Sequence, residues 1–334
     1  MNPRPAPTEP FRPPAWLRGP HLQTMLSSMG IRRFGLSRGA REVRAQSRPM
    51  VLDCGAGVRL LGLHSAQPER GRSLVVLLHG WEGSADSNYM WSAATYHYAA
   101  GHDVFRLNLR DHGPSHHLNE GLFHSCRIDE VVGAVGELAR LAAGRPMHLV
   151  GYSLGGNFAL RVALRAPGAG IPLTSAIAIS PVLDPAHTLR CLEQRTWLYR
   201  NYFVQKWRRS LRRKAAAWPG RYVLDDLLRA RGLGPMTREL VERYTDYPDM
   251  QSYLDGYALV GPILAGLLVP SHILTSLDDP IIPADDLARL SPSAALTIET
   301  TERGGHCAFL DALQGPSWVD RRIAGLIEGV SVGC

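Results

Sequence analysis

Short apolar runs alternate with longer amphipathic stretches from about residue 50 to the end of the chain. This alternation is typical of βα units arranged around a mostly parallel sheet. An earlier pair of runs near 50–64 is expected to form an antiparallel hairpin at the edge of that sheet. Strands are expected at 74–78, 103–107, 147–152, 175–179, 271–275 and 295–299, and helices at 87–100, 126–143, 154–166, 284–290 and 315–328.

The alternation fails once, between about 184 and 265, where the strands stop and the sequence becomes helical, basic and aromatic. An insertion without strands of its own is most simply a helical cap placed over the sheet. The expected organisation is therefore an α/β core formed by residues 46–183 and 266–334, with a cap insertion at 184–265.

The first 45 residues are expected to form an arm that lies across the body instead of a separate domain. Seven prolines occur between Pro3 and Pro20, and apolar residues then recur at helical intervals. These apolar residues are Leu22, Met25, Leu26 and Met29.

The composition indicates a single large folded body, because 334 residues with 45% hydrophobic content can bury a full core. No apolar run approaches the roughly 20 residues that span a bilayer, and the start of the chain lacks the apolar core of a secretory signal. The five cysteines are widely spaced and contain no CxxC pair. A cytoplasmic protein with free thiols is expected.

The formal net charge of +7 permits attraction to anionic partners, but no nucleic-acid-binding motif accompanies it, so no nucleic-acid partner is expected. In the cap, a solvated basic face packed on the core through its aromatic side chains is favoured, and a peripheral contact with anionic membrane stays open. The oligomeric state is not determined. The basic residues are Arg195, Arg200, Lys206, Arg208, Arg209, Arg212, Arg213 and Lys214, among Trp197, Tyr199, Tyr202, Phe203 and Trp207.

The strongest chemical signal is the GxSxG segment Gly151–Gly155, which follows an expected strand and precedes an expected helix. In this setting Ser153 projects from a tight turn as a nucleophile, as in the α/β-hydrolase fold. A helix-capping serine is the structural alternative. A serine hydroxyl needs a base and an orienting acid, which in this fold follow in the order acid, then histidine. Asp278 and Asp279 follow the strand at 271–275, and His306 lies in a glycine-containing loop after the last strand.

A tetrahedral intermediate also needs backbone donors for its oxyanion. The segment His79–Gly83 follows the strand at 74–78, at the place where this fold supplies one donor. The backbone amides of Trp81 and Leu154 are therefore expected to form the oxyanion hole, the latter at the N-terminus of the helix that follows the nucleophile.

The chain resembles the YheT-like group of α/β-hydrolases, bacterial relatives of the abhydrolase-domain lipases. The resemblance rests on FRPPAWLRGPHLQTML (11–26), HGWEGS (79–84), GYSLGGN, SLDDPIIP and ERGGHCAF. It implies Asp279 as the acid, since the family pattern places a proline four residues later, at Pro283, and leaves Asp278 as the fallback. It also implies hydrolysis of carboxylic esters, lipid or acyl esters included, through an acyl-enzyme, without a cofactor. The loop 108–125 departs from the Arg-Gly pair of many relatives.

Two other classes of function remain open. A thioesterase or C–C bond hydrolase would use the same three residues, and a silent hydrolase-fold binding protein would use none of them. The histidines of the 108–125 loop match no standard metal-ligand spacing, so hydrogen-bonded or pocket-lining roles are expected and no metal is assigned. These histidines are His112, His116, His117 and His124.

Overall fold

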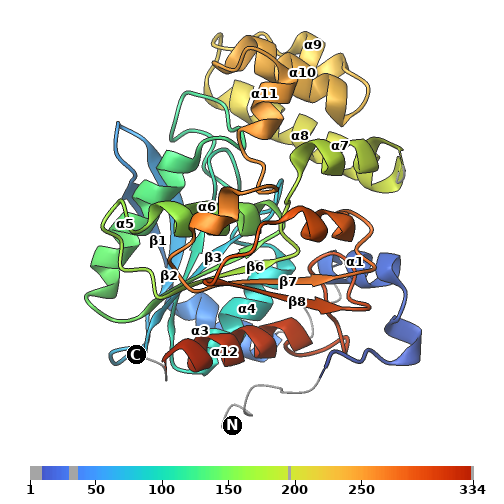
Figure 1. Ribbon diagram of the computed structural model, residues 1–334. Coiled ribbons are helices and arrows are strands. Elements are labelled where there is room, and N and C mark those ends of the chain that lie inside the picture. Colours follow the sequence, from blue (N-terminus) through green and yellow to red (C-terminus); the bar gives the residue numbers. More distant parts are fainter. Residues whose placement is uncertain (1–9, 30–36, 195–196, 332–334) are drawn as a thin grey trace.

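The computed structural model describes residues 10–29, 37–194 and 197–331 (Figure 1). The remainder of the expected arm and Arg195 of the basic stretch lie outside the described residues. No helix in the described ranges is both long enough and apolar enough to cross a membrane.

An eight-stranded sheet with the order β1-β2-β4-β3-β5-β6-β7-β8 forms the centre of the molecule. Strands β3 to β8 pair in parallel, while the hairpin β1–β2 is antiparallel and joins the sheet through an antiparallel β2–β4 pair. The expected α/β architecture with a mostly parallel sheet is confirmed. The strands are β1 (Ser47–Asp53), β2 (Arg59–Ser65), β3 (Leu74–Leu78), β4 (Asp103–Leu107), β5 (Met147–Tyr152), β6 (Ser175–Ile179), β7 (Ser271–Ser276) and β8 (Leu296–Thr301).

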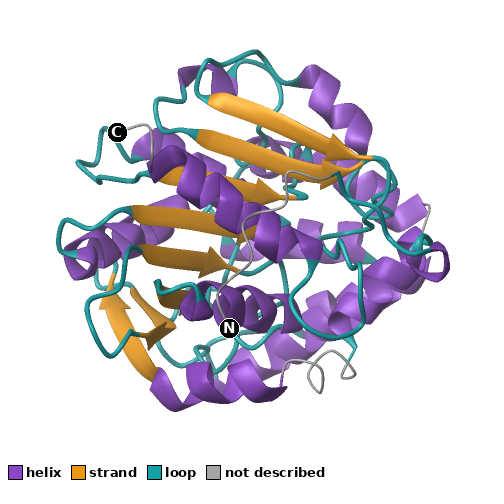
Figure 2. Ribbon diagram, turned by 90° about the horizontal axis from the view of Figure 1, so that it is seen from below, coloured by secondary structure: helices purple, strands orange, loops and turns teal. Residues whose placement is uncertain are grey.

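Helices cover both faces of the sheet, which explains why strands such as β3 are apolar at every position and buried throughout (Figures 1 and 2). One core cluster joins the sheet to α5 (Ile128–Ala142) and α6 (Leu154–Arg165). A second cluster on the other face includes residues of α3 (Ser37–Gln46), α4 (Asn88–Ala99) and α12 (Trp318–Ser331). The segment expected to be helical near 284–290 forms a 3₁₀ helix, η3 (Ala284–Arg289).

Between β6 and β7 the chain forms a group of helices that lies above the sheet in Figure 1, and we call this group the cap. An apolar cluster that includes Val204 and Met236 of the cap continues into the body through Leu122, Ile281 and Ile282. The helices of the cap are α7 (Pro185–Gln194), α8 (Trp197–Ala217), α9 (Asp225–Arg229), α10 (Leu233–Tyr244) and α11 (Met250–Asp255), followed by the 3₁₀ helix η2 (Ile263–Gly266).

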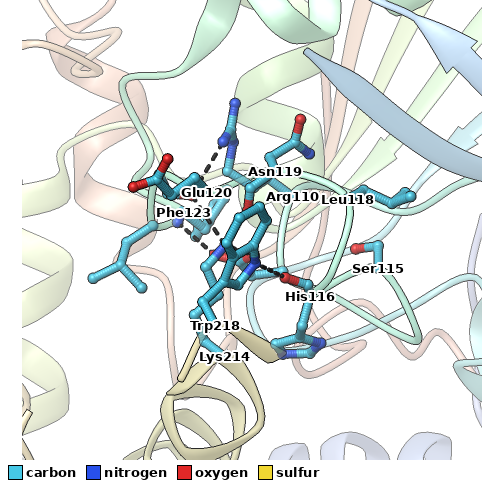
Figure 3. A network of polar contacts seen from close by, with 12 residues as sticks. Arg110, Ser115, His116, Leu118, Asn119, Glu120, Phe123, Lys214 and Trp218 are labelled. Atoms are coloured by element: carbon cyan, nitrogen blue, oxygen red, sulfur yellow. Dashed lines mark hydrogen bonds and ion pairs between the residues drawn. The ribbon is translucent and has the colours of Figure 1, made fainter. Parts of the chain in front are cut away.

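The cap is held to the body by a buried network around Lys214 (Figure 3). Lys214 Nζ donates to Asp111 Oδ1 at 2.8 Å and to the carbonyl oxygen of Asn119 at 2.5 Å. Trp218 Nε1 donates to the carbonyl oxygen of His116 at 3.0 Å. The expectation of a solvated basic face is therefore wrong for Lys214, whose side chain is only 1% exposed. A lone buried ammonium would be costly, and the carboxylate and carbonyl oxygens of the 108–125 loop stabilise this one.

The arm forms the 3₁₀ helix η1 (Ala15–Leu17) and helix α1 (Pro20–Ser28), which lies beside the ends of β7 and β8 in Figure 1. The apolar spacing predicted this helix, but apart from the partly buried Leu26 the side that it buries is polar. Gln23, Thr24 and Ser27 are buried, whereas Leu22 and Met25 are 40% and 45% exposed. Polar burial is tolerated here because hydrogen bonds satisfy the buried groups.

Candidate active site

Ser153 occupies a strained turn between β5 and α6, with φ 55° and ψ −119°. A non-glycine residue rarely adopts a positive φ, and here it turns the chain sharply from strand to helix. Two glycines permit the turn. A Cβ on Gly151 would lie 2.0 Å from the carbonyl oxygen of Gly155, and a Cβ on Gly155 would lie 2.5 Å from that of His79. The spacing of the GxSxG segment thus follows from close backbone packing around the serine.

His306 and Asp279 form a buried pair at the ends of β8 and β7. His306 Nδ1 lies 2.8 Å from Asp279 Oδ2, and the two side chains are 10% and 0% exposed. The other carboxylate oxygen of Asp279 accepts hydrogen bonds from the amides of Ile281 and Ile282. Burial alone would lower the pKa of His306, but the Asp279 carboxylate outweighs it and holds this pKa well above 6.5. The pair fixes the imidazole and leaves Nε2 on the opposite side, 3.7 Å from Cys307 Sγ.

Asp278, the fallback acid, contacts the same loop at a different point. Its Oδ1 accepts a hydrogen bond of 2.9 Å from the amide of Gly305. This contact supports the backbone that precedes His306 and does not involve the imidazole. The carboxylate that contacts the histidine ring is that of Asp279.

Ser153 and His306 line one cavity of about 690 Å³, together with Trp81 and Leu154. Within the described ranges no hydrogen bond joins the Ser153 hydroxyl to the imidazole. Such contacts are often long in an unliganded site and shorten when substrate binds. The structure therefore brings Ser153, His306, Trp81 and Leu154 to the wall of this cavity and places Asp279 against His306.

The amides of Trp81 and Leu154 have no protein acceptor in the described part of the chain, unlike those of three residues beside them. The amide of Gly80 donates to Tyr89 Oη, that of Glu82 to His112 Nε2, and that of Ser153 to the carbonyl oxygen of Ile179. Two unoccupied N–H groups beside a nucleophile are the donors that an oxyanion requires.

The histidine-rich loop between β4 and α5 contributes His112, His116 and His124 to the cavity wall, but not His117. His112 Nε2 accepts from the amide of Glu82, so its Nδ1 carries the proton and donates to the carbonyl oxygen of Arg110. Burial lowers the pKa of His112, and it lowers that of His116 to about 4. These histidines are therefore neutral hydrogen-bonding groups that shape the wall beside Trp81.

The sequence reasoning missed the contribution of the arm to the site. Thr24 Oγ1 accepts a hydrogen bond of 2.9 Å from the backbone amide of His306. Gln23 donates to the carbonyl oxygen of Leu310 and accepts from its amide, both at 2.8 Å. The only available signal was the resemblance of the 11–26 segment to the YheT-like group, which gives no position in space.

A serine on a strained strand-to-helix turn, with a buried histidine–aspartate pair facing the same cavity, is the arrangement of the α/β-hydrolases. The chain belongs to that family, because the model of the alpha/beta hydrolase family matches residues 75–315. Within the family it is YheT-like. It is 24% identical over 311 residues to YheT of Escherichia coli (strain K12), which covers 91% of this chain and 88% of that protein.

Solved structures show the same fold. A membrane phospholipase A, described as a bacterial virulence factor, superimposes with a TM-score of 0.56 at 19% identity and covers 92% of each chain. The Pyrococcus furiosus esterase Pf2001 superimposes with a TM-score of 0.57 at 14% identity, over 85% of this chain and 91% of that one.

Proposed function

We propose that this protein is a serine hydrolase that cleaves carboxylic esters through an acyl-enzyme intermediate. The observation that carries the proposal is the Asp279–His306 pair, which faces the same cavity as Ser153 on its strained turn. Strain at a non-glycine residue persists where the surrounding structure imposes it, and such residues cluster at active sites.

In the proposed mechanism, the Ser153 hydroxyl attacks the carbonyl carbon of the ester while His306 Nε2 takes its proton. The oxyanion that forms accepts hydrogen bonds from the amides of Trp81 and Leu154. His306 then returns the proton to the departing alcohol, which leaves an acyl group on Ser153. Water, activated by the same imidazole, releases the acid. Asp279 keeps the proton on Nδ1 in the resting state and stabilises the imidazolium during each transfer.

The walls of the cavity suit an ester with an apolar acyl group. The cap supplies many apolar side chains, and Ile281 and Ile282 extend the same surface beyond Asp279. We therefore propose residues 184–265 as a functional unit that encloses the acyl chain and limits its length. The leucines of the cap in this wall are Leu189, Leu192, Leu198, Leu233, Leu240 and Leu254.

Covalent labelling tests the proposal. A fluorophosphonate probe should modify the wild-type protein once, and Ser153→Ala should abolish the label. The same variant should reduce turnover of p-nitrophenyl butyrate by on the order of 10³ or more. Ser28→Ala is a matched control, because Ser28 lines the same cavity. Labelling that persists in Ser153→Ala, or that is lost equally in Ser28→Ala, would contradict the assignment.

A further inference from the structure

Helix α8 presents a row of three cations to the cavity. Lys206, Arg209 and Arg213 line its wall, whereas Arg208 and Arg212 do not. Spacings of three and four residues place side chains on one helical face, and seven residues span about 10 Å. The row begins next to the reaction centre, because Lys206 Nζ donates to the carbonyl oxygen of Glu82, the residue after Trp81, at 3.0 Å.

The acidic side chains of this wall do not neutralise the row. Asp111 is paired with Lys214 at 2.8 Å, and Asp86 lies 3.8 Å from Arg106. Burial raises the pKa of Glu82 to about 8 against the opposing charges of Lys206 and Arg213, so this carboxyl group offsets the charge of the row only weakly near neutral pH. Arg209 and Arg213 are exposed and join no ion pair within the described ranges. This part of the cavity wall therefore carries an uncompensated positive charge.

The lining also includes many apolar side chains, so one cavity offers both cationic and apolar contacts. We infer that it accepts an ester whose acyl chain is apolar and whose alcohol part carries a phosphate or carboxylate, bound by Lys206, Arg209 and Arg213. Guanidinium groups suit both anions, because their N–H donors match two oxygens at once. The inference rests on the proposed function in naming the substrate of Ser153, and it adds an anion-binding subsite to the catalytic residues.

The test compares hexanoyl esters of glycerol, glycerol 3-phosphate and glyceric acid as monomers in solution. The measured quantity is the ratio of kcat/KM for each anionic ester to that for the neutral one. The wild type should show a ratio well above one. In Arg209→Gln/Arg213→Gln this ratio should fall about tenfold through KM, as expected for two partly exposed ion pairs.

The matched control is Arg212→Gln/Arg229→Gln. It removes the same charge from exposed cap residues that do not line the cavity. An unchanged ratio in the control supports a local subsite. A wild-type ratio near one, or an equal fall in the control, overturns the inference, since long-range attraction would then explain the preference.

Two further measurements separate the remaining possibilities. Calorimetric binding of hexanoylglycerol 3-phosphate to Ser153→Ala does not depend on hydrolysis. If Arg209→Gln/Arg213→Gln weakens this binding about tenfold, the subsite is supported even if the proposed function fails. Absent binding, or binding that the substitutions leave unchanged, overturns it. Cleavage of phosphatidic acid in vesicles is then compared with cleavage of the monomeric ester, to identify the kind of molecule that carries the phosphate group of the substrate. Cleavage in vesicles alone would assign it to a lipid headgroup, and cleavage of the monomer alone to a dissolved ester.

Discussion

Asp278 and Asp279 are chemically identical neighbours with different partners. Asp279 contacts the imidazole of His306, and Asp278 contacts the amide of Gly305. Their order after β7 was apparent from the sequence. The direction of each side chain depends on the turn 277–283 and on a loop 27 residues later, so only the family pattern favoured one of them.

Substituting each aspartate by asparagine should separate these roles. Asp279→Asn removes the charge that stabilises the imidazolium and allows the wrong tautomer, so kcat for p-nitrophenyl butyrate should fall by on the order of 10²–10⁴. Asp278→Asn keeps an oxygen that can accept from Gly305, so kcat should change only a few-fold. Thermal unfolding of both variants checks that the fold persists. The reverse ranking would transfer the role to Asp278.

The pH dependence of kcat/KM should reveal the raised pKa of His306. Only the neutral imidazole can take the Ser153 proton, and the protonated form dominates below its pKa. Because Asp279 holds that pKa well above 6.5, kcat/KM of a soluble ester should continue to rise as the pH increases beyond 6.5. In Asp279→Asn the largest influence that raises this pKa is lost while burial still lowers it, so the residual activity should titrate at lower pH. An apparent pKa at or below 6.5 in the pH profile of kcat/KM of the wild type would contradict this prediction.

At the scale of secondary structure, burial on both faces made the strands easy to predict. Runs such as LVVLL of β3 are apolar at every position, and their ends in the structure lie within two residues of those expected. The face that α1 buries could not be predicted in this way. Its buried polar residues bind partners 282 to 287 positions later, and a local periodicity contains no information about them.

Helix α1 should influence catalysis through Thr24, a positioning residue for His306. Thr24→Val keeps the shape of the side chain but leaves the His306 amide without its acceptor. We expect kcat to fall on the order of tenfold to a hundredfold with little change in KM, because small displacements of a base are costly. The apparent pKa in the pH profile of kcat/KM should also shift.

Thr24→Ser is the matched control, because it retains the hydroxyl group. It should keep both kcat and the apparent pKa in the pH profile close to those of the wild type. A merely structural role would lower the melting temperature of Thr24→Val without changing the apparent pKa in the pH profile. If the serine variant were as impaired as the valine variant, the lost methyl contact and not the hydrogen bond would be responsible.

At the scale of the whole molecule, the cavity is shared by the arm, the core and the cap, and Lys214 joins the cap to the core. The composition of residues 184–265 predicted a helical insertion. It could not show which of eight nearby cations would be buried, because that depends on where the 108–125 loop places Asp111 and its carbonyl oxygens.

Lys214→Met should destabilise the protein by about 3–5 kcal/mol, because it leaves the Asp111 carboxylate buried without its cation. Chemical denaturation measures this change. Arg212→Met is the control, since Arg212 is exposed on the same helix and its loss should alter the free energy of unfolding by less than about 0.5 kcal/mol. Equal effects in the two variants would show that the Lys214–Asp111 pair has no special role.

The contact between α1 and the His306 loop joins segments 282 residues apart, and this separation determines when the active site can be completed during synthesis. Thr24 is translated 282 residues before His306, an interval of roughly 15 to 60 s at elongation rates of about 5–20 residues per second. Strands β3 to β6 and the Ser153 turn can emerge from the ribosome in that time. The loop that carries His306 emerges only afterwards. A nascent chain therefore carries the Ser153 turn but no hydrolytic activity until the segment around His306 has emerged and meets helix α1.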